Sequence, residues 1–522
     1  MEESFITLSK SIANEFLRDI VFIDECAYPT NEPNEEQKAV KANKFNAQSV
    51  STAFCKAGKI CAIYAPQSDL DIEVCMQALK KADSIVLDWD LNLKETKDFD
   101  PMEDVAEDEG KYTKQIIRNI LEDAGNKKIK LIIIYTGELD LPDICKQVSQ
   151  ISHDLELDAA ELVCQQKNVR ILVRAKETTQ YNHAEHLKNK IVAYEDLPHL
   201  INEEFAKLTT GLLSNYALNA ITAIRNNTSN ILGVFSQDID AAFLGHYVSV
   251  EDCNDAVFML SDIFGSAITD LINTQQIDLK PWIESWVEYY MPQPITTQIA
   301  GQNINIDANI LKQILSNGNS NLKETFQAAT SKDIGKDKIK KEATKLFNPN
   351  VDVQLSNYKL AQIIQHKDLF SNNANKIPHK LSTGTIVKYT YNDKEEYLLC
   401  IQQSCDSVRI TQNTRNFLFL PLIQTRKNKE EAIVINQAKH LFVNNESFSL
   451  RIFTFETKEN ETEITTIIEE GRAVFKDSNN ICFEWVAELK ELFAQHIVSL
   501  YAANLSRVGI NNSEWMRLQG KK

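Results

Sequence analysis

Acidic side chains stand directly after two apolar runs in the first third of the chain. Asp24 and Glu25 follow the run 20–23, and Asp88 follows the run 85–87. Carboxylate oxygens are the ligands that Mg²⁺ takes from proteins. Three carboxylates in one place would raise at least one of their pKa values unless a cation offset them. With a cation in place, the Asp88 carboxylate could attack a phosphoryl group and form an aspartyl phosphate.

A hydroxyl and a cation follow two further apolar runs. Thr136 comes directly after residues 131–135, and Lys176 comes shortly after residues 169–173. A lysine ammonium would neutralise charge on transferring phosphoryl oxygens, and a threonine hydroxyl would donate a hydrogen bond to them. Arg174 precedes Lys176 by two positions, so either residue could fill the basic position.

The runs that precede these side chains have the length and continuous apolar character of strands buried on both faces. Five such runs occur, at 20–23, 60–64, 85–87, 131–135 and 169–173. Segments of helical period lie between them, as at 74–82 and 112–124. The pattern predicts a doubly wound α/β domain of flavodoxin type over residues 1–185, with a five-stranded parallel sheet. Because ligands bind at the carboxyl ends of such strands, the five side chains should share one crevice.

In the rest of the chain the spacing of apolar residues changes twice. Residues 195–290 keep a helical period and predict an all-α bundle. After a proline-containing linker at 291–294, residues 300–522 predict a mixed, β-rich domain. Its strands are expected mainly at 380–480, and a closing helix is expected at 484–505. The chain is therefore expected to be multidomain.

Composition limits the classes of function. At ~150 residues per domain, the 522 residues suggest about three domains, and 56 basic against 73 acidic residues give a net charge of −17. Such a charge opposes binding to nucleic acid or to an anionic membrane surface. No run reaches the ~18 apolar residues of a membrane span, and the ten cysteines include no Cys-x-x-Cys pair. These features predict a cytoplasmic protein with reduced thiols.

The strand-end residues resemble the receiver domain of two-component signalling proteins. The matching segments are 21–25, 82–89 and 136–137, and the resemblance extends over residues ~15 to 180. It implies that Asp88 is the phosphoacceptor and that Asp24, Glu25 and Asp88 bind Mg²⁺. It also implies that Thr136 and Lys176 contact the phosphoryl group and that a histidine kinase is the donor.

The chain departs from the common receiver pattern in ways that suggest a narrower resemblance. About 35 residues separate the first two strands, and no Lys-Pro pair follows the fifth strand. These departures, with the segments 397–409 and 417–422, are similar to a divergent receiver class of antiphage defence operons, including the Detocs system. That resemblance implies a component that takes phosphate from the kinase and buffers the signal, with no enzymatic activity beyond its own phosphotransfer and dephosphorylation.

Other readings of the sequence stay open. The acids could belong to a receiver-like adaptor that assembles partners without phosphorylation, or residues 380–520 could hold an effector enzyme. A transcription regulator is disfavoured by the charge and by the lack of a helix-turn-helix pattern. The helical region could read out phosphorylation, hold a homodimer or bind the kinase.

Overall fold

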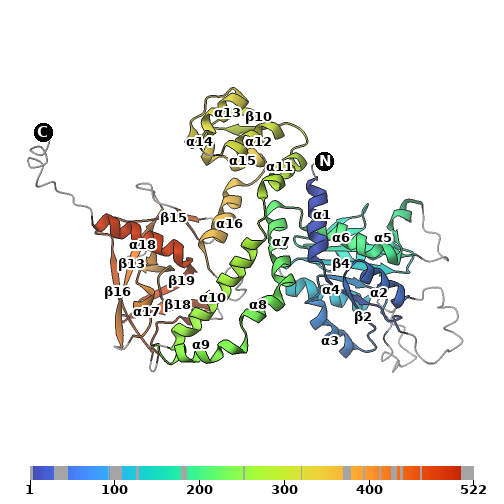
Figure 1. The fold of residues 1–522 in the computed structure, drawn as a ribbon, viewed down its shortest axis with the longest axis horizontal. Helices are drawn as coiled ribbons and strands as arrows, with labels where there is room; N and C mark the ends of the chain where they lie inside the picture. Colours follow the sequence, from blue (N-terminus) through green and yellow to red (C-terminus); the bar gives the residue numbers. More distant parts are fainter. Residues whose placement is uncertain are drawn as a thin grey trace, which may run out of the picture. The chain divides into compact units, whose positions relative to one another are not determined.

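The computed structural model divides into two compact units, Met1–Pro292 and Gln293–Lys522, which we describe separately (Figure 1). The residues that the structure describes are 4–28, 45–91, 93, 109–124, 128–177, 185–250, 253–318, 320–367, 378–391, 394–410, 413–424, 432–435, 439–458 and 461–506. Within these residues, no helix is both long enough and apolar enough to cross a membrane.

A mostly parallel sheet forms the centre of the first unit. Its parallel strands are β1 (Asp19–Ile23), β2 (Ile60–Tyr64), β3 (Ser84–Leu87), β4 (Lys130–Thr136) and β7 (Val169–Lys176). They lie in the order β2-β1-β3-β4-β7, with every neighbouring pair parallel. The four residues of β3 and the seven of β4 are all buried, as the continuous apolar runs predicted. All five predicted strands are confirmed.

The predicted count of five strands is too low, because the sheet has eight. An antiparallel hairpin of β5 (Glu156–Asp158) and β6 (Val163–Gln166) extends it beyond β7, and β8 (Ile191–Val192) pairs with the end of β7. These strands have two to four residues, and β5 is exposed along its length. Their sequences therefore lack the buried apolar run that identified the others.

Helices cover both faces of this sheet. Apolar side chains of α3 (Asp69–Leu79), α4 (Lys111–Ala124) and α5 (Leu141–Ser149) pack on one face. The other face is covered by α1 (Phe5–Phe16), α2 (Ala47–Lys56), α6 (Leu197–Leu208) and α7 (Leu212–Asn226). The structure thus has the two-sided covering that a parallel sheet requires.

The remaining helices of the first unit follow α7. They are α8 (Thr228–Val234), α9 (Asp240–Tyr247), α10 (Cys253–Thr274) and α11 (Leu279–Tyr290). Arg225 fastens the end of α7 to the sheet, because its guanidinium contacts Asp83 at 3.0 Å and Asp19 at 3.3 Å and donates to the Phe16 carbonyl. The helices expected within 195–290 are present, and α6 and α7 pack against the parallel sheet.

The second unit begins with a small hairpin and a group of helices. The hairpin pairs β9 (Ile295–Ile299) with β10 (Gln302–Ile306). The helices are α12 (Ala308–Asn317), α13 (Leu322–Thr330), α14 (Lys336–Lys341), α15 (Thr344–Phe347) and α16 (Val353–Gln365).

An antiparallel sheet makes up most of the second unit and closes on itself. Its strands are β11 (Thr385–Tyr391), β12 (Lys394–Cys400), β13 (Thr414–Ile423), β14 (Ala432–Ile435), β15 (Lys439–Val443), β16 (Arg451–Glu456), β17 (Ile467–Glu469), β18 (Arg472–Lys476) and β19 (Cys482–Glu488). Pairing runs β16-β13-β12-β11-β19-β18, and a bridge between Phe455 and Asp477 joins the two ends. Aromatic side chains, including Phe417, Phe419 and Phe483, fill the resulting barrel. The predicted β-rich character is confirmed.

The closing helix begins later than predicted. It is α18 (Glu491–Leu505), and residues 484–488 belong to strand β19 instead. Phe483 and Ala487 are both buried, and a spacing of four places two residues on one side of a helix and also of a strand. Backbone pairing with β11 and β18 makes this segment a strand and not the start of the helix.

Candidate functional site

The carboxyl ends of β1, β3 and β7 bring two carboxylates and one ammonium into contact. Lys176 Nζ lies 2.8 Å from Asp24 Oδ2 and 2.6 Å from Asp88 Oδ2. All three side chains are buried, with Lys176 4%, Asp24 0% and Asp88 9% exposed. This juxtaposition follows from the parallel order of the strands, because β1 lies between β2 and β3. Lys176 therefore meets two acids at one edge of the sheet, although Asp24 lies 152 positions and Asp88 lies 88 positions away from it in the sequence.

Lys176, not Arg174, faces the acids. The Arg174 side chain is also buried, but its Nη1 donates to the backbone carbonyls of Glu161 and Val173. Burial disfavours the Lys176 ammonium, yet the charges of Asp88 and Asp24 outweigh burial and raise its pKa above the usual value. Lys176 is therefore held as a cation between the two carboxylates.

Glu25 is the acid in this cluster that Lys176 does not contact. Its Oε2 is buried with no hydrogen-bond partner among the described residues, and its Oε1 accepts from the Cys26 thiol at 3.5 Å. Burial, with the charges of Asp88 and Asp24, raises the pKa of Glu25 to about 8. Burial likewise raises the pKa of Asp24 to about 6, although Lys176 works against it. The single positive charge of Lys176 does not neutralise the negative charges of three carboxylates.

The donor set fits a divalent cation. Ligand atoms of Asp24, Glu25 and Cys26 lie within 4.8 Å of one another. Of these, the oxygens of Asp24 and Glu25 suit the hard ion Mg²⁺, whereas the Cys26 thiol suits softer metals. The unpartnered Glu25 oxygen is the group that such an ion would satisfy. A cation there would also offset the repulsion that raises the Asp24 and Glu25 pKa values.

Trp89 contacts Asp88, and Thr136 ends β4, the strand that neighbours β3. Thr136, at the end of β4, is buried, and its Oγ1 accepts from the Glu138 amide at 3.1 Å, which leaves its O–H to donate. Asp88 Oδ1 accepts from the Trp89 amide at 2.8 Å, and the Asp88 carbonyl accepts from Thr113 Oγ1 at 2.7 Å. The Trp89 amide thus orients the Asp88 carboxylate, and Thr113 of α4 holds the Asp88 backbone.

Two contributors were not identified from the sequence. The Phe45 ring lies 5.8 Å from Lys176 Nζ and packs against Phe22 at a tilt and against Tyr194 edge-to-face, so an aromatic cluster lies beside the ammonium. Glu138 is exposed, and partial desolvation together with the charges of Asp90 and Asp88 raises its pKa. Phe45 carries no local signal in the sequence, but Glu138 lies two residues beyond Thr136 and could have been suspected.

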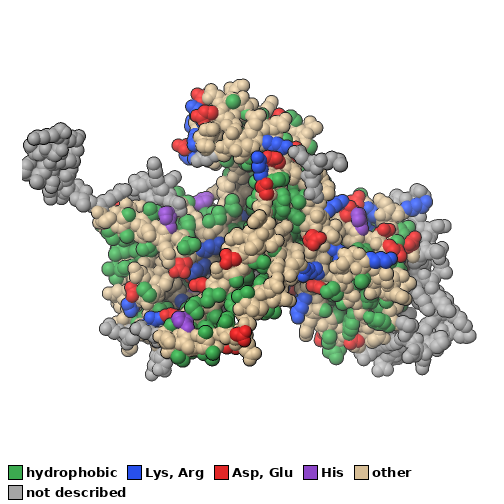
Figure 2. All heavy atoms as spheres, viewed as in Figure 1, with side chains coloured by type: hydrophobic (Ala, Val, Ile, Leu, Met, Phe, Trp, Pro, Cys, Tyr) green, Lys and Arg blue, Asp and Glu red, His purple; other side chains and the backbone are tan. Residues whose placement is uncertain are grey.

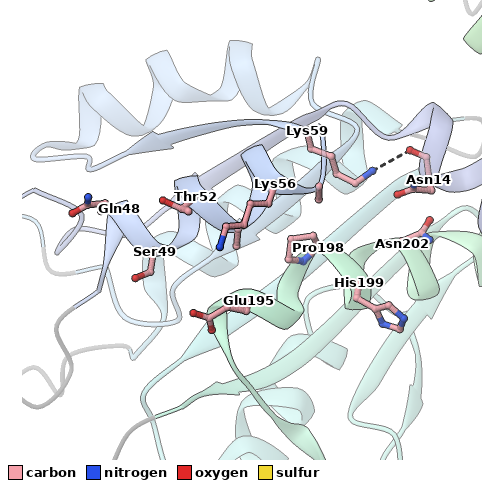
Figure 3. A pocket seen from close by; sticks show the side chains of 12 residues that line it. Asn14, Gln48, Ser49, Thr52, Lys56, Lys59, Glu195, Pro198, His199 and Asn202 are labelled. Carbon is pink, nitrogen blue, oxygen red and sulfur yellow. Dashed lines mark hydrogen bonds between the residues drawn. The ribbon is translucent and has the colours of Figure 1, made fainter.

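A separate cavity of about 550 Å³ lies between α2 and the start of α6 (Figure 3). Polar side chains line most of it, including Thr52, Lys56 and Asn202, and Lys59 Nζ beside it donates to the Asn14 carbonyl at 3.0 Å. None of the five predicted site residues lines this cavity. The chemistry predicted from the sequence therefore belongs to the sheet edge and not to this cavity.

Comparison with protein families agrees with this geometry. Residues 16–181 match the model of the response receiver domain family, which covers about a third of the chain. The search of curated proteins and the search of solved structures gave no match. The match supports a response-regulator receiver in the first unit and the phosphoacceptor role of such domains.

Proposed function

We propose that this chain is the phosphoacceptor of a two-component-like signalling system in the bacterial cytoplasm, with Asp88 as the accepting residue. One observation carries the proposal: Lys176 Nζ bridges the buried Asp24 and Asp88 carboxylates at the carboxyl edge of a receiver-type sheet. A structural ion pair would need one carboxylate, whereas Lys176 contacts two and a third, that of Glu25, lies beside Asp24. Such an excess of negative charge fits a site built for a metal and a phosphoryl group.

The donor in this proposal is a partner histidine kinase. The P–N bond of a phosphohistidine that is protonated on its other ring nitrogen breaks as a bond forms between phosphorus and a carboxylate oxygen of Asp88, and the imidazole leaves as a neutral base with the electron pair of the broken bond. Lys176 holds the Asp88 carboxylate and then neutralises phosphoryl oxygens, while the Thr136 O–H donates to one of them. Asp24, Glu25 and Asp88 would hold Mg²⁺, which supplies charge neutralisation during the transfer.

The output of the proposed transfer is removal of phosphate from the kinase. We place the chain with the receivers of antiphage defence systems of the Detocs type, as a component that buffers the signal. The support is the resemblance in residues 397–409 and 417–422, beside the receiver domain at residues 16–181. We propose no catalysis beyond phosphotransfer and autodephosphorylation. The helical region is the part that we assign to a homodimer.

The test is the intact mass of the full chain after incubation with Mg²⁺ and acetyl phosphate, and separately with the cognate kinase and ATP. We expect one phosphoryl adduct on the natural sequence and none on Asp88→Asn. Asp90→Asn is the matched control, because it removes a carboxylate two residues away and should keep the adduct. If neither donor gives an adduct, the phosphoacceptor proposal is wrong and the adaptor alternative stands.

A further inference from the structure

Helices α8 to α10 expose more large apolar side chains per residue than the rest of the first unit. Ten large apolar side chains between positions 228 and 274 are 37% to 77% exposed. They are Leu232, Val234, Ile239, Leu244, Val248, Val257, Phe258, Leu260, Ile263 and Phe264. Scattered single apolar residues are normal on a protein surface, but a group of this size marks an interaction site. We call residues 228–274 the helical arm.

Helix α10 has a distinct apolar face and a distinct polar face. At 100° per residue, Val257, Leu260 and Phe264 fall on one side of the helix, and Asp262 and Ser266 fall on the other. Within this helix Ala256 is fully buried, whereas the neighbouring Val257 is 51% exposed. The apolar face is therefore only partly covered by α7 and α9, the helices that pack against α10.

The arm carries acidic residues and no lysine or arginine. Between Arg225 and Lys280 the sequence contains no lysine or arginine. A helix that lies on an anionic membrane needs basic residues on its polar face, and nucleic-acid binding needs them as well. The negative charge of the arm therefore opposes binding to an anionic membrane and to nucleic acid. A protein surface is the partner that remains. Figure 2 shows apolar side chains gathered over α9 and the adjoining part of α10.

We propose that the helical arm is the surface through which two copies of this chain associate. The exposed side chains that share one face of the arm offer on the order of several hundred Å² of apolar surface, a patch size that marks an interaction site on a protein surface. In a two-fold dimer the same face of α10 meets itself, so Val257, Leu260 and Phe264 pack together. The acids on the opposite side of α10 then stay in solvent and do not repel one another across the interface.

The helical arm is attached to the receiver sheet through α7. Helix α7, against which α10 packs, is held to the sheet by Arg225, and Asn215 Nδ2 donates to the buried Ser9 Oγ of α1 at 2.8 Å. Association through the arm would therefore pair two receiver domains. This inference rests on the homodimer proposed above and names its surface, and it does not depend on phosphorylation of Asp88.

The experiment is sedimentation equilibrium of the full chain over a wide concentration range. We expect a monomer–dimer equilibrium for the natural sequence. Leu260→Lys and Phe264→Lys should each weaken dimerisation by about 100-fold or more, as for central residues of an interface. Ser266→Lys is the matched control, because it adds the same charge to the polar side of the same helix. Circular dichroism and the unfolding temperature of each variant show that it folds.

Amide hydrogen exchange of residues 253–274 gives a second measurement. In a dimer the protection of α10 rises with protein concentration. A monomer at every concentration would overturn the proposal, whether α10 is then protected by another part of its own chain or is not protected. A dimer that Leu260→Lys, Phe264→Lys and Ser266→Lys leave equally intact would also overturn it, because the contact would lie elsewhere. Asp88→Asn should dimerise like the natural sequence, so a failed phosphoacceptor proposal leaves this test valid.

Discussion

At the scale of single residues, Lys176 stabilises the fold as well as the site. Replacing it in Lys176→Met leaves the buried Asp24 and Asp88 carboxylates facing each other without a counter-charge. We expect the free energy of unfolding to fall by about 3–5 kcal/mol, as when one partner of a buried ion pair is removed. Urea denaturation in the absence of divalent metal measures this change.

The double variant Lys176→Met, Asp88→Asn provides the control for that loss. Removing the second charge should restore part of the stability, and the two substitutions should be strongly non-additive. Saturating Mg²⁺ should also restore part of the stability of Lys176→Met, because the three carboxylates would then have a cation. An unchanged unfolding free energy in Lys176→Met would show that the bridge seen here does not hold the site together.

Gly110 is required beside the acceptor loop for two separable reasons. Its φ is +70°, and a Cβ atom at this position would lie 2.5 Å from the Trp89 ring. Gly58 has the same φ of +70° with nothing within 4 Å of such a Cβ. Gly58→Ala should therefore cost only the backbone strain of about 1–2 kcal/mol. Gly110→Ala should add a clash of about 1–3 kcal/mol.

Chemical denaturation of the two alanine variants gives this difference directly, and Trp89 fluorescence reports the displaced ring in Gly110→Ala. Equal losses in the two variants would mean that Trp89 moves aside without cost. The acceptor loop would then be less rigid than its packing indicates.

The sequence was informative about the site because its chemistry follows strand ends. Asp24, Asp88 and Thr136 could be placed together once the strands were identified, since parallel strands end at one edge. The choice between Lys176 and Arg174 could not be made in the same way. It depends on which side chain reaches across the sheet edge, and only the three-dimensional contacts to Asp24 and Asp88 decide it.

At the scale of elements, two side chains at the end of α16 satisfy the exposed edge of β14. Among the described residues, β14 is the first strand in the order of the antiparallel sheet and pairs only with β15. Gln365 Nε2 donates to the Ala432 carbonyl, and Gln365 Oε1 accepts from the Val434 amide. His366 Nε2 bonds the Val434 carbonyl at 2.7 Å. These bonds supply partners that an unpaired strand edge would otherwise seek from another chain.

Stability of the second unit should depend on pH through His366. Burial lowers the pKa of this imidazole below 6.5, so the folded state favours the neutral ring. As pH falls below about 6.5, the unfolded state takes up a proton first and stability decreases. The natural sequence should therefore lose stability from pH 7.5 to 5.5, with a slope from this group of at most about 1.4 kcal/mol per pH unit.

His366→Gln keeps a donor near the Val434 carbonyl and removes the titration. The difference between the unfolding free energies of the natural sequence and this variant isolates the contribution of His366 from the other histidines. That difference should be constant above pH 7 and should shrink or reverse below pH 6. A constant difference over the whole range would mean that the imidazole is protonated as readily in the folded state as in the unfolded state.

Prediction of elements failed where strands were short or where two periods coincided. The hairpin β5–β6 has no long apolar run, and β9–β10 alternates polar and buried residues over only five positions in each strand. Residues 483 and 487 fit both a helix and a strand, and the long-range pairing of β19 with β11 resolved the ambiguity. Local pattern determines long buried strands well, whereas short strands depend on partners far along the chain.

At the scale of the whole molecule, the proposed functions fall within one unit. The acid site, Thr136, Lys176 and the helical arm all lie in residues 1–292, which form the first compact unit. The second unit has its own aromatic core inside a closed antiparallel barrel and a further core beneath α18. Two separate cores predict two independent unfolding transitions for the full chain. Each unit should therefore fold when expressed alone.

A fragment ending at Pro292 should both accept phosphate and dimerise. Intact mass after acetyl phosphate and Mg²⁺ measures the first property, and sedimentation equilibrium measures the second. We expect the rate of adduct formation and the dimerisation constant to stay within about threefold of the full-chain values, because a shift below ~1 kcal/mol indicates no essential contact. A fragment that accepts phosphate but stays monomeric would show that dimerisation requires residues 293–522. In that case the dimer contact lies in the second unit, and the helical arm is not the interface between two copies.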